Sequence, residues 1–150
     1  MTCESRDSMK SVHFPKILLV DDHLAMLQQT IRLLPESYEV VEALESGSGL
    51  TAAVARHEPD LVVLDITLPG LSGIELASCL RRSGCSTKIV FLTVHCDTDY
   101  AREAFAAGAN GYVVKARLAS DLVPALEAVL AGKKFISPCA ELEGWDDADP

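Results

Sequence analysis

Short, nearly continuous apolar runs divide the chain into regular units. Five runs, several of them rich in β-branched residues, are each followed by a stretch with apolar positions at helical spacing; the runs cover residues 16–20, 38–43, 61–64, 88–93 and 111–115. Unbroken apolar runs of this length are typical of strands that are covered on both faces. Strand and helix therefore alternate five times, which predicts right-handed crossovers and a parallel sheet.

The helical segments have recognisable ends. Ser72, followed by Glu75 three residues later, forms a capping-box pattern that predicts the start of a helix. Proline or glycine follows the other segments and predicts where they stop. The helices predicted in this way cover residues 24–34, 50–57, 74–80, 97–107 and 120–131.

These elements predict one α/β domain. We expect a three-layer, doubly wound fold of the flavodoxin-like kind, with a five-stranded parallel sheet between two layers of helices. A chain of 150 residues is the right length for one such domain. Residues 1–14 are expected to form a flexible N-terminal arm, residues 15–136 the domain, and residues 137–150 an acidic tail or the start of a linker.

Composition narrows the class of protein. With 49% hydrophobic and 23% charged residues the chain can build a core, and its net charge of -9 argues against direct binding of nucleic acid. No apolar run is long enough for a membrane helix, and no signal peptide opens the chain, which predicts a soluble, cytoplasmic protein. The five cysteines lack CxxC spacing, which predicts buried free thiols and no disulfide framework.

Polar residues follow the apolar runs at the points where the predicted strands end. These residues are Asp21 and Asp22 after the first run, Asp65 at the end of the third, Thr93 at the end of the fourth and Lys115 at the end of the fifth. Taken singly, each has an ordinary interpretation as a helix cap or a solvated side chain. Because the carboxyl ends of parallel strands meet at one sheet edge, the five together predict a functional crevice.

The chemistry expected of this crevice is phosphoryl transfer. Two carboxylates about 4 Å apart repel each other by roughly 4 kcal/mol at an effective dielectric constant near 20, so a cation is required. Carboxylate oxygens suit Mg²⁺, while Lys115 and Thr93 suit phosphoryl oxygens. The chain has no P-loop and no GxGxxG motif, so the phosphate must come from another donor. Asp65 is the best candidate for a covalent acceptor, because it ends a fully apolar strand and precedes an open loop.

These motifs resemble the receiver domain of a two-component response regulator, over roughly residues 16–138. The resemblance is carried by the residues named above, by Pro69, Gly70 and Gly73 after Asp65, and by the GYVVK stretch at 111–115. The stretches LTVHCD, GANGYVVK and AGKKFISP further resemble the LuxR-type (NarL/FixJ) subclass, without its DNA-binding domain. We expect either a stand-alone receiver or the N-terminal fragment of a transcription regulator.

The resemblance implies roles for the site residues. Asp65 would accept a phosphoryl group from a sensor histidine kinase or from a small acyl phosphate. Asp22, Asp65 and the backbone carbonyl of Thr67 would bind Mg²⁺ directly, and Asp21 would act through water. Lys115 would pair with Asp65 and then with the phosphoryl oxygens.

The same resemblance implies a switch. Thr93 would move toward the phosphoryl group, and Tyr112 would swing inward to fill the space. Many receivers have proline after the lysine, where this chain has Ala116, so the geometry of that peptide bond is left open. His23, His57 and His95 match no role in the family.

The function expected is therefore a signalling switch rather than an enzyme, since its only catalysis would be its own phosphorylation and dephosphorylation. A homodimer is a possible partner, and no membrane is expected. Two alternatives stay open. An aspartate-nucleophile phosphatase of the haloacid-dehalogenase type is disfavoured because its second aspartate, two positions after the nucleophile, is missing. A receiver that binds partners without phosphate is disfavoured because all five site residues are present.

Overall fold

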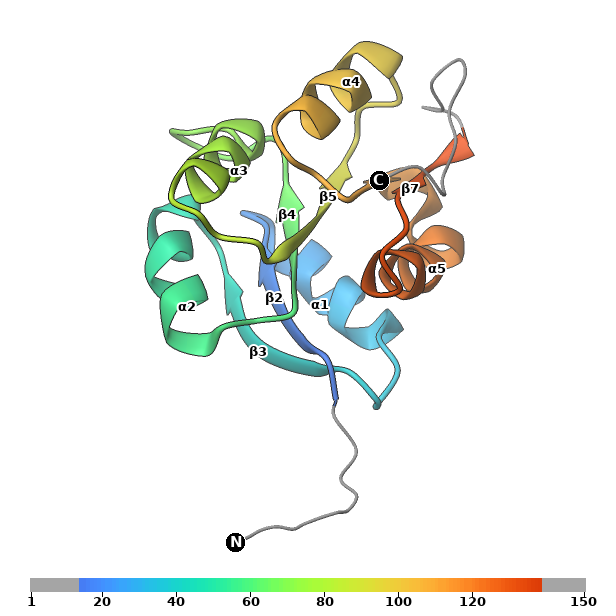
Figure 1. The fold of residues 1–150 in the computed structure, drawn as a ribbon. Helices are drawn as coiled ribbons and strands as arrows, with labels where there is room; N and C mark the ends of the chain where they lie inside the picture. The colour runs from blue at the N-terminus through green and yellow to red at the C-terminus, as the bar shows by residue number, and fades with distance from the viewer. Residues whose placement is uncertain (1–13, 139–150) are drawn as a thin grey trace, which may run out of the picture.

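A single parallel sheet runs through the part of the chain that the computed structural model describes, residues 14–138 (Figure 1). Its strand order is β3-β2-β4-β5-β6-β7, and every neighbouring pair is parallel. The strands are β2 (Lys16–Val20), β3 (Glu39–Leu44), β4 (Leu61–Asp65), β5 (Lys88–Thr93), β6 (Gly111–Val114) and β7 (Phe135–Ile136).

The sheet has one strand more than the five predicted. Strand β7 contains only two residues, which pair with Gly111 and Tyr112 of β6. A strand of two residues is too short to show an apolar run in the sequence. It forms because it pairs with β6. The α/β class and the parallel, doubly wound arrangement are confirmed.

Helices cover both faces of the sheet. They are α1 (Leu24–Leu33), α2 (Leu50–His57), α3 (Gly73–Arg82), α4 (Thr98–Ala106) and α5 (Leu118–Leu130), with short 3-10 turns η1 (Gly47–Gly49) and η2 (Lys115–Arg117). The capping box is confirmed: Ser72 Oγ accepts a hydrogen bond from the Glu75 N–H, and Glu75 Oε1 accepts one from the Ser72 N–H. Helix α5 begins two residues before Ser120, because η2 leads directly into it.

The core consists of two apolar layers, one on each face. Helices α2, α3 and α4 pack on one face, where Phe91 and Tyr112 are the largest fully buried side chains. Helices α1 and α5 pack on the other face, around residues such as Leu19 and Leu122. Alternate residues of each central strand point to opposite layers, so the strands are apolar except at their ends, as the pattern predicts.

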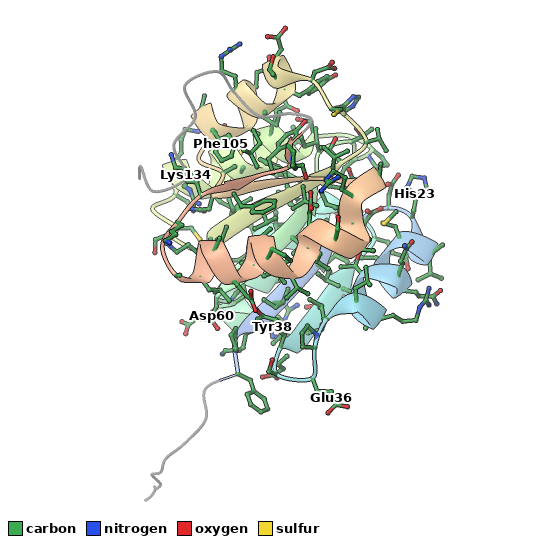
Figure 2. All side chains as sticks on the ribbon, turned by 90° about the vertical axis from the view of Figure 1, so that its right-hand side faces the viewer. His23, Glu36, Tyr38, Asp60, Phe105 and Lys134 are labelled. Atoms are coloured by element: carbon green, nitrogen blue, oxygen red, sulfur yellow. The ribbon has the colours of Figure 1, made fainter. Side chains whose placement is uncertain are left out.

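The two ends of the sheet carry different chemistry. From β2 the chain passes outward to β3 and then returns to β4 on the other side, so the strand order reverses between β2 and β4. Ligand sites of such sheets lie at the carboxyl ends of the strands beside this reversal. Figure 2 shows His23, which follows β2, at the end opposite Asp60, whose carboxylate accepts a hydrogen bond from the backbone N–H of Lys16.

The fold continues past the predicted end of the domain. Ser137 is fully buried, its N–H donates to the carbonyl of Tyr112, and its hydroxyl donates to Asp121. Near β7, the ammonium of Lys134 lies 5.8 Å from the centre of the Phe105 ring of α4 (Figure 2). The predicted arm, apart from Phe14, and the predicted tail from residue 139 onward lie outside the described residues.

The expectation of buried free thiols is confirmed in part for the described cysteines. Cys79 and Cys85 are free, but Cys79 is exposed on α3 and Cys85 is partly exposed in the loop after it, so burial was wrong. Cys96, in the loop after β5, is disulfide-bonded, so the prediction of a free thiol was wrong there. Among residues 14–138, none of the helices is long and apolar enough to cross a membrane.

Candidate functional site

Three charged side chains from three elements meet at the carboxyl edge of the sheet. Lys115 follows β6, and its Nζ lies 3.1 Å from Asp65 Oδ2 at the end of β4 and 3.1 Å from Asp21 Oδ2 after β2. Both aspartates are 3% exposed. The sheet topology thus brings together residues that are up to 94 positions apart in the sequence.

The electrostatics of this group follow from burial and from mutual contact. Burial raises the pKa of Asp65 above its usual value, and the nearby charge of Asp21 raises it too, which outweighs the opposite effect of Lys115. Burial alone would lower the pKa of Lys115, but the contacts with Asp21 and Asp65 raise it. The crevice therefore holds a firmly protonated lysine beside a carboxylate whose charge is only partly compensated.

The backbone around Asp65 holds its carboxylate in place. Oδ1 accepts a hydrogen bond of 3.0 Å from the N–H of Thr67, which closes a tight turn after β4. Gly73, the first residue of α3, packs so closely on the carbonyl of Asp65 that any Cβ would collide with it. Its N–H donates to the carbonyl of Ile66 at 2.7 Å. Glycine at this position allows α3 to begin directly against the end of β4.

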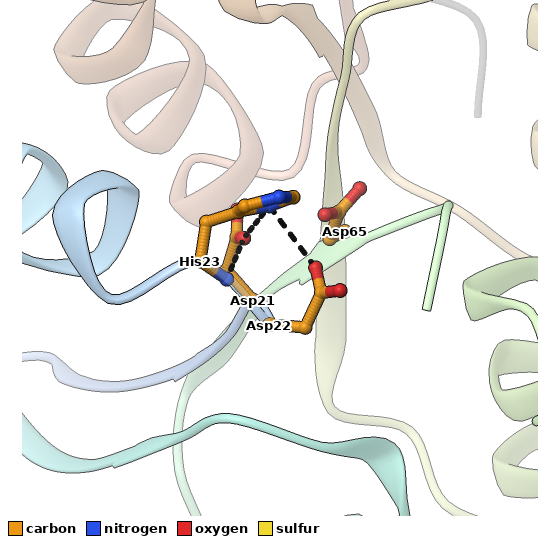
Figure 3. A group of neighbouring side chains, drawn as sticks. All are labelled: Asp21, Asp22, His23 and Asp65. Carbon is orange, nitrogen blue, oxygen red and sulfur yellow. Dashed lines mark hydrogen bonds and ion pairs between the residues drawn. The ribbon is translucent and has the colours of Figure 1, made fainter. Parts of the chain in front are cut away.

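Asp22 and His23 complete an acidic cluster (Figure 3). One ligand atom from each of Asp21, Asp22, His23 and Asp65 lies within 4.8 Å of the others. Asp22 Oδ1 is a buried atom that accepts no hydrogen bond within the described residues, whereas Asp21 Oδ2 forms the ion pair with Lys115. Buried carboxylate oxygens normally have partners, so an orphaned oxygen of this kind fits a bound cation. The donor set, dominated by carboxylate oxygens, fits a hard divalent ion.

Thr93 and Tyr112 form a second group beside the cluster. Thr93 ends β5 and is fully buried, and its Oγ1 accepts a hydrogen bond of 3.1 Å from the N–H of His95. The hydroxyl of Tyr112 donates to the carbonyl of His95 at 2.8 Å, and its ring is fully buried. Burial raises the pKa of the Tyr112 phenol, so it keeps its proton. The His95 ring stacks on Tyr100 of α4, with ring centres 4.0 Å apart.

A cavity of about 640 Å³ opens beside this second group. It lies between α3 and α4 and is lined by Thr67, His95 and Tyr100, together with the carboxylates Glu75 and Glu103. The loop between β5 and α4 therefore borders both Thr93 and the cavity between α3 and α4.

The structure gathers most of the predicted site residues. Asp21, Asp65 and Lys115 are in contact, and Asp22 lies in the same cluster. The backbone carbonyl of Thr67 as a metal ligand stays a prediction; the hydrogen bond from Thr67 to Asp65 is made by its N–H.

The structure also shows the position of Tyr112 and the peptide bond after Lys115. Tyr112 already occupies the inward position that the resemblance reserves for the phosphorylated state. The peptide bond between Lys115 and Ala116 is trans, since no cis bond occurs among the described residues.

Sequence reasoning missed two histidines. His23 joins the acidic cluster, and His95 links Thr93 to Tyr112 through its backbone. The position of His23 directly after an aspartate pair is a signal that could have suggested a ligand. No signal marks the link through His95, because its hydrogen bonds to Thr93 and Tyr112 are made by backbone atoms.

Comparison with known proteins agrees with this geometry. The model of the family "Response regulator receiver domain" matches residues 17–127. The response regulator GacA of Pseudomonas aeruginosa is 33% identical over 125 residues, which is 82% of this chain and 58% of that protein. The transcriptional regulatory protein DegU of Brevibacillus brevis is 31% identical over 126 residues, which is 82% of this chain and 53% of that protein. The chain thus spans little more than half of these relatives.

Solved structures show the same fold. A LuxR-family two-component response regulator from Aurantimonas sp. SI85-9A1 is 36% identical with a TM-score of 0.81, covering 85% of this chain and 93% of that one. The isolated REC domain of RcsB from Salmonella enterica serovar Typhimurium, in the presence of phosphomimetic BeF3-, is 25% identical with a TM-score of 0.79, covering 85% of this chain and 96% of that one. From residue 17 to residue 127, this chain belongs to the response regulator receiver domain family.

Proposed function

We propose that the crevice is a phosphoacceptor site in which Asp65 takes a phosphoryl group from the phosphohistidine of a sensor histidine kinase, or from a small acyl phosphate, with Mg²⁺ as cofactor. The observation that carries this proposal is the buried contact between Lys115 and two carboxylates, 3.1 Å in each case. A lysine in this position offsets the charge of a nucleophilic carboxylate and of an incoming phosphoryl group.

In the proposed reaction, the phosphoryl group passes from the donor imidazole to Asp65. A carboxylate oxygen of Asp65 attacks phosphorus and forms an O–P bond, while the P–N bond to the donor imidazole breaks. The leaving imidazole keeps the electron pair of that bond and takes up a proton. Asp22 and Asp65 would hold the Mg²⁺ directly and Asp21 through water, and the ion would supply positive charge opposite the phosphoryl oxygens.

The switch is proposed to act through Thr93. Its hydroxyl oxygen accepts a hydrogen bond from the N–H of His95 in this structure, and a hydroxyl that accepts can also donate, so Thr93 would donate its proton to a phosphoryl oxygen. A phosphoryl group adds about 1.5 to 2 negative charges and new acceptor oxygens, so Thr93 and Lys115 gain bonds only in the modified state. Because His95 joins Thr93 and Tyr112, movement of Thr93 would be passed to the loop before α4.

The output is proposed from the relatives. Several are named as transcriptional regulators, so in a longer protein this domain would control transcription through a LuxR-type helix-turn-helix domain. A receiver acting alone would work through contact with another protein. The domain would be a cytoplasmic switch that catalyses only its own phosphorylation and dephosphorylation, with a homodimer as a possible active form.

Acetyl phosphate provides the test. With Mg²⁺ present, the intact mass of the protein should rise by one phosphoryl group, and Asp65→Asn should abolish the increase. Asp99→Asn is a matched control, because Asp99 lies on the exposed side of α4 with 89% of its side chain exposed. An increase that survives in Asp65→Asn, or is absent from the wild type, would overturn the proposal.

Turnover separates the switch from a phosphatase. An aspartate-nucleophile phosphatase would hydrolyse many equivalents of an ordinary phosphate monoester, whereas the proposed switch takes up a single phosphoryl group and releases it slowly. Rapid multiple turnover of p-nitrophenyl phosphate would therefore favour the enzyme.

A further inference from the structure

His23 brings an imidazole nitrogen to the acidic crevice. Its Nδ1 lies 3.2 Å from Asp22 Oδ1 and 3.5 Å from Asp21 Oδ1, although 70% of its side chain is exposed (Figure 3). The backbone N–H of His23 also donates to Asp21 Oδ1 at 2.9 Å. This turn, closed by an aspartate side chain, holds the ring beside the carboxylates while its outer side faces solvent.

The contact with His23 leaves Asp22 Oδ1 without a hydrogen bond among the described residues. Asp22 Oδ1 is a buried atom that accepts no hydrogen bond within residues 14–138, so its contact with His23 lacks hydrogen-bond geometry. Asp21 is 3% exposed; its Oδ2 pairs with Lys115 Nζ at 3.1 Å, and its Oδ1, the atom nearer His23, accepts the His23 N–H. An unsatisfied carboxylate oxygen beside an imidazole nitrogen indicates a ligand that the two share.

The four ligand atoms lie nearly close enough to share a single ion. An ion about 2.1 Å from each ligand places neighbouring ligand atoms about 3.0 to 3.4 Å apart and opposite ones about 4.2 Å apart. Nδ1 lies 3.2 and 3.5 Å from the two nearest oxygens, and the whole group lies within 4.8 Å, so the side chains need to close only slightly to bind one ion. Because the ring is largely exposed, Nε2 can keep its proton toward water while Nδ1 faces the ion.

We propose that His23 is a metal ligand that changes which ion the crevice prefers. Oxygen ligands suit Mg²⁺, whereas imidazole suits Co²⁺, Ni²⁺ and Zn²⁺. With one nitrogen beside three carboxylates, the site binds a divalent transition ion in competition with Mg²⁺. This inference rests on the proposed function, because it concerns the same crevice.

Calorimetric titration of the full chain, free of any purification tag, with CoCl₂ and separately with MgCl₂ tests the inference. His23→Ala should weaken Co²⁺ binding about ten-fold or more. Replacing even a residue that only hydrogen-bonds to a metal ligand typically weakens metal binding about 10- to 100-fold. Mg²⁺ binding should change by less than about two-fold, because Mg²⁺ takes its ligands from oxygen. His57→Ala is the control, since His57 contacts Glu42 on β3.

Proton NMR gives a second measurement that needs no variant. Co²⁺ should shift the ring resonances of His23 strongly, and those of His57 far less. Equal loss of Co²⁺ and Mg²⁺ affinity in His23→Ala would overturn the inference, as would unshifted His23 resonances at saturating Co²⁺. Failure of the proposed function would appear elsewhere, as the absence of Asp65 phosphorylation by acetyl phosphate with Mg²⁺ in the wild-type protein.

Discussion

Lys115 Nζ lies 3.1 Å from Asp65 Oδ2, and this contact joins residues that are 50 positions apart at the edge of the sheet. Replacing Lys115 with methionine keeps most of the side-chain volume but leaves two buried carboxylates without their cation. We expect the free energy of unfolding to fall by about 3 kcal/mol at pH 7, as is usual when one partner of a buried ion pair is removed.

The loss of stability in Lys115→Met should depend on pH, because Asp65 becomes protonated at acid pH. Without Lys115 the pKa of Asp65 in the folded state rises further, so protonation of the carboxylate relieves the penalty at acid pH. Urea denaturation at pH 7 and at pH 4 should therefore show a smaller difference from wild type at pH 4. Lys133→Met, at an exposed lysine, is the control. An equal loss at both pH values would point to packing rather than charge.

Asp65→Asn should stabilise the unmodified protein. Burial raises the folded-state pKa of Asp65 above its usual 3.8, so the carboxylate costs stability as pH rises above 3.8 through the folded-state value. An amide removes that cost while Lys115 keeps its contact with Asp21. Changes of this kind at functional sites typically add about 1 kcal/mol.

Thermal denaturation of Asp65→Asn between pH 3.5 and pH 8 measures this effect. The melting temperature should exceed that of wild type at neutral pH, and the two curves should converge toward pH 3.5. Asp60→Asn, at the opposite end of the sheet, shows what loss of a structural carboxylate does, since Asp60 accepts a hydrogen bond from the backbone N–H of Lys16. A lower melting temperature for Asp65→Asn at pH 7 would mean that Asp65 stabilises the fold.

Much of the fold and site could be predicted because the relevant physics is local or set by topology. Unbroken apolar runs identify strands buried on both faces, and the pattern of Ser72 and Glu75 identifies a helix start without any tertiary contact. Once the sheet is parallel, the carboxyl ends of its strands must share an edge. That topology places Asp65 and Lys115 at the same edge, and the long side chain of Lys115 reaches past β5 to contact Asp65.

The features that could not be predicted depend on contacts that the pattern does not record. Strand β7 forms because two residues pair with β6. Ser137 is buried because its hydroxyl forms hydrogen bonds with Val114 and Asp121. The inward position of Tyr112 depends on the carbonyl of His95, a backbone atom that every residue type has. The approach of His23 to Asp22 depends on a turn conformation rather than on residue type alone.

Tyr112→Phe should loosen the loop before α4. The substitution removes the 2.8 Å hydrogen bond to the His95 carbonyl while keeping the buried ring. We expect a loss of about 1 kcal/mol in stability and faster amide exchange from residue 94 to residue 106. Hydrogen exchange with mass spectrometry measures the second effect. Tyr100→Phe is the matched control because it keeps the ring stack on His95, and an equal change in both variants would contradict the role of the hydroxyl.

Ser137→Ala should destabilise the protein although Ser137 lies at the start of the predicted tail. Its hydroxyl donates to Asp121 Oδ2 at 2.8 Å and accepts from the N–H of Val114 at 3.0 Å, in a fully buried position. Leaving a buried N–H and a buried carboxylate oxygen without this partner should cost about 2 kcal/mol. Urea denaturation of the variant, beside Ser46→Ala at an exposed serine, measures the loss.

The pH dependence of the stability of Ser137→Ala tests whether the lost bond to Asp121 causes the deficit. Burial alone would raise the pKa of Asp121, but hydrogen bonds from Arg117, Ser137 and Ser120 lower it. A carboxylate with a lowered folded-state pKa contributes stability above its unfolded value of 3.8, and this contribution is lost as pH falls through the folded-state value. Because Ser137→Ala removes one of these hydrogen bonds, its deficit should be largest near pH 7 and should shrink below pH 3. A deficit that stays constant from pH 7 to pH 2.5 would assign the loss to the N–H of Val114 instead.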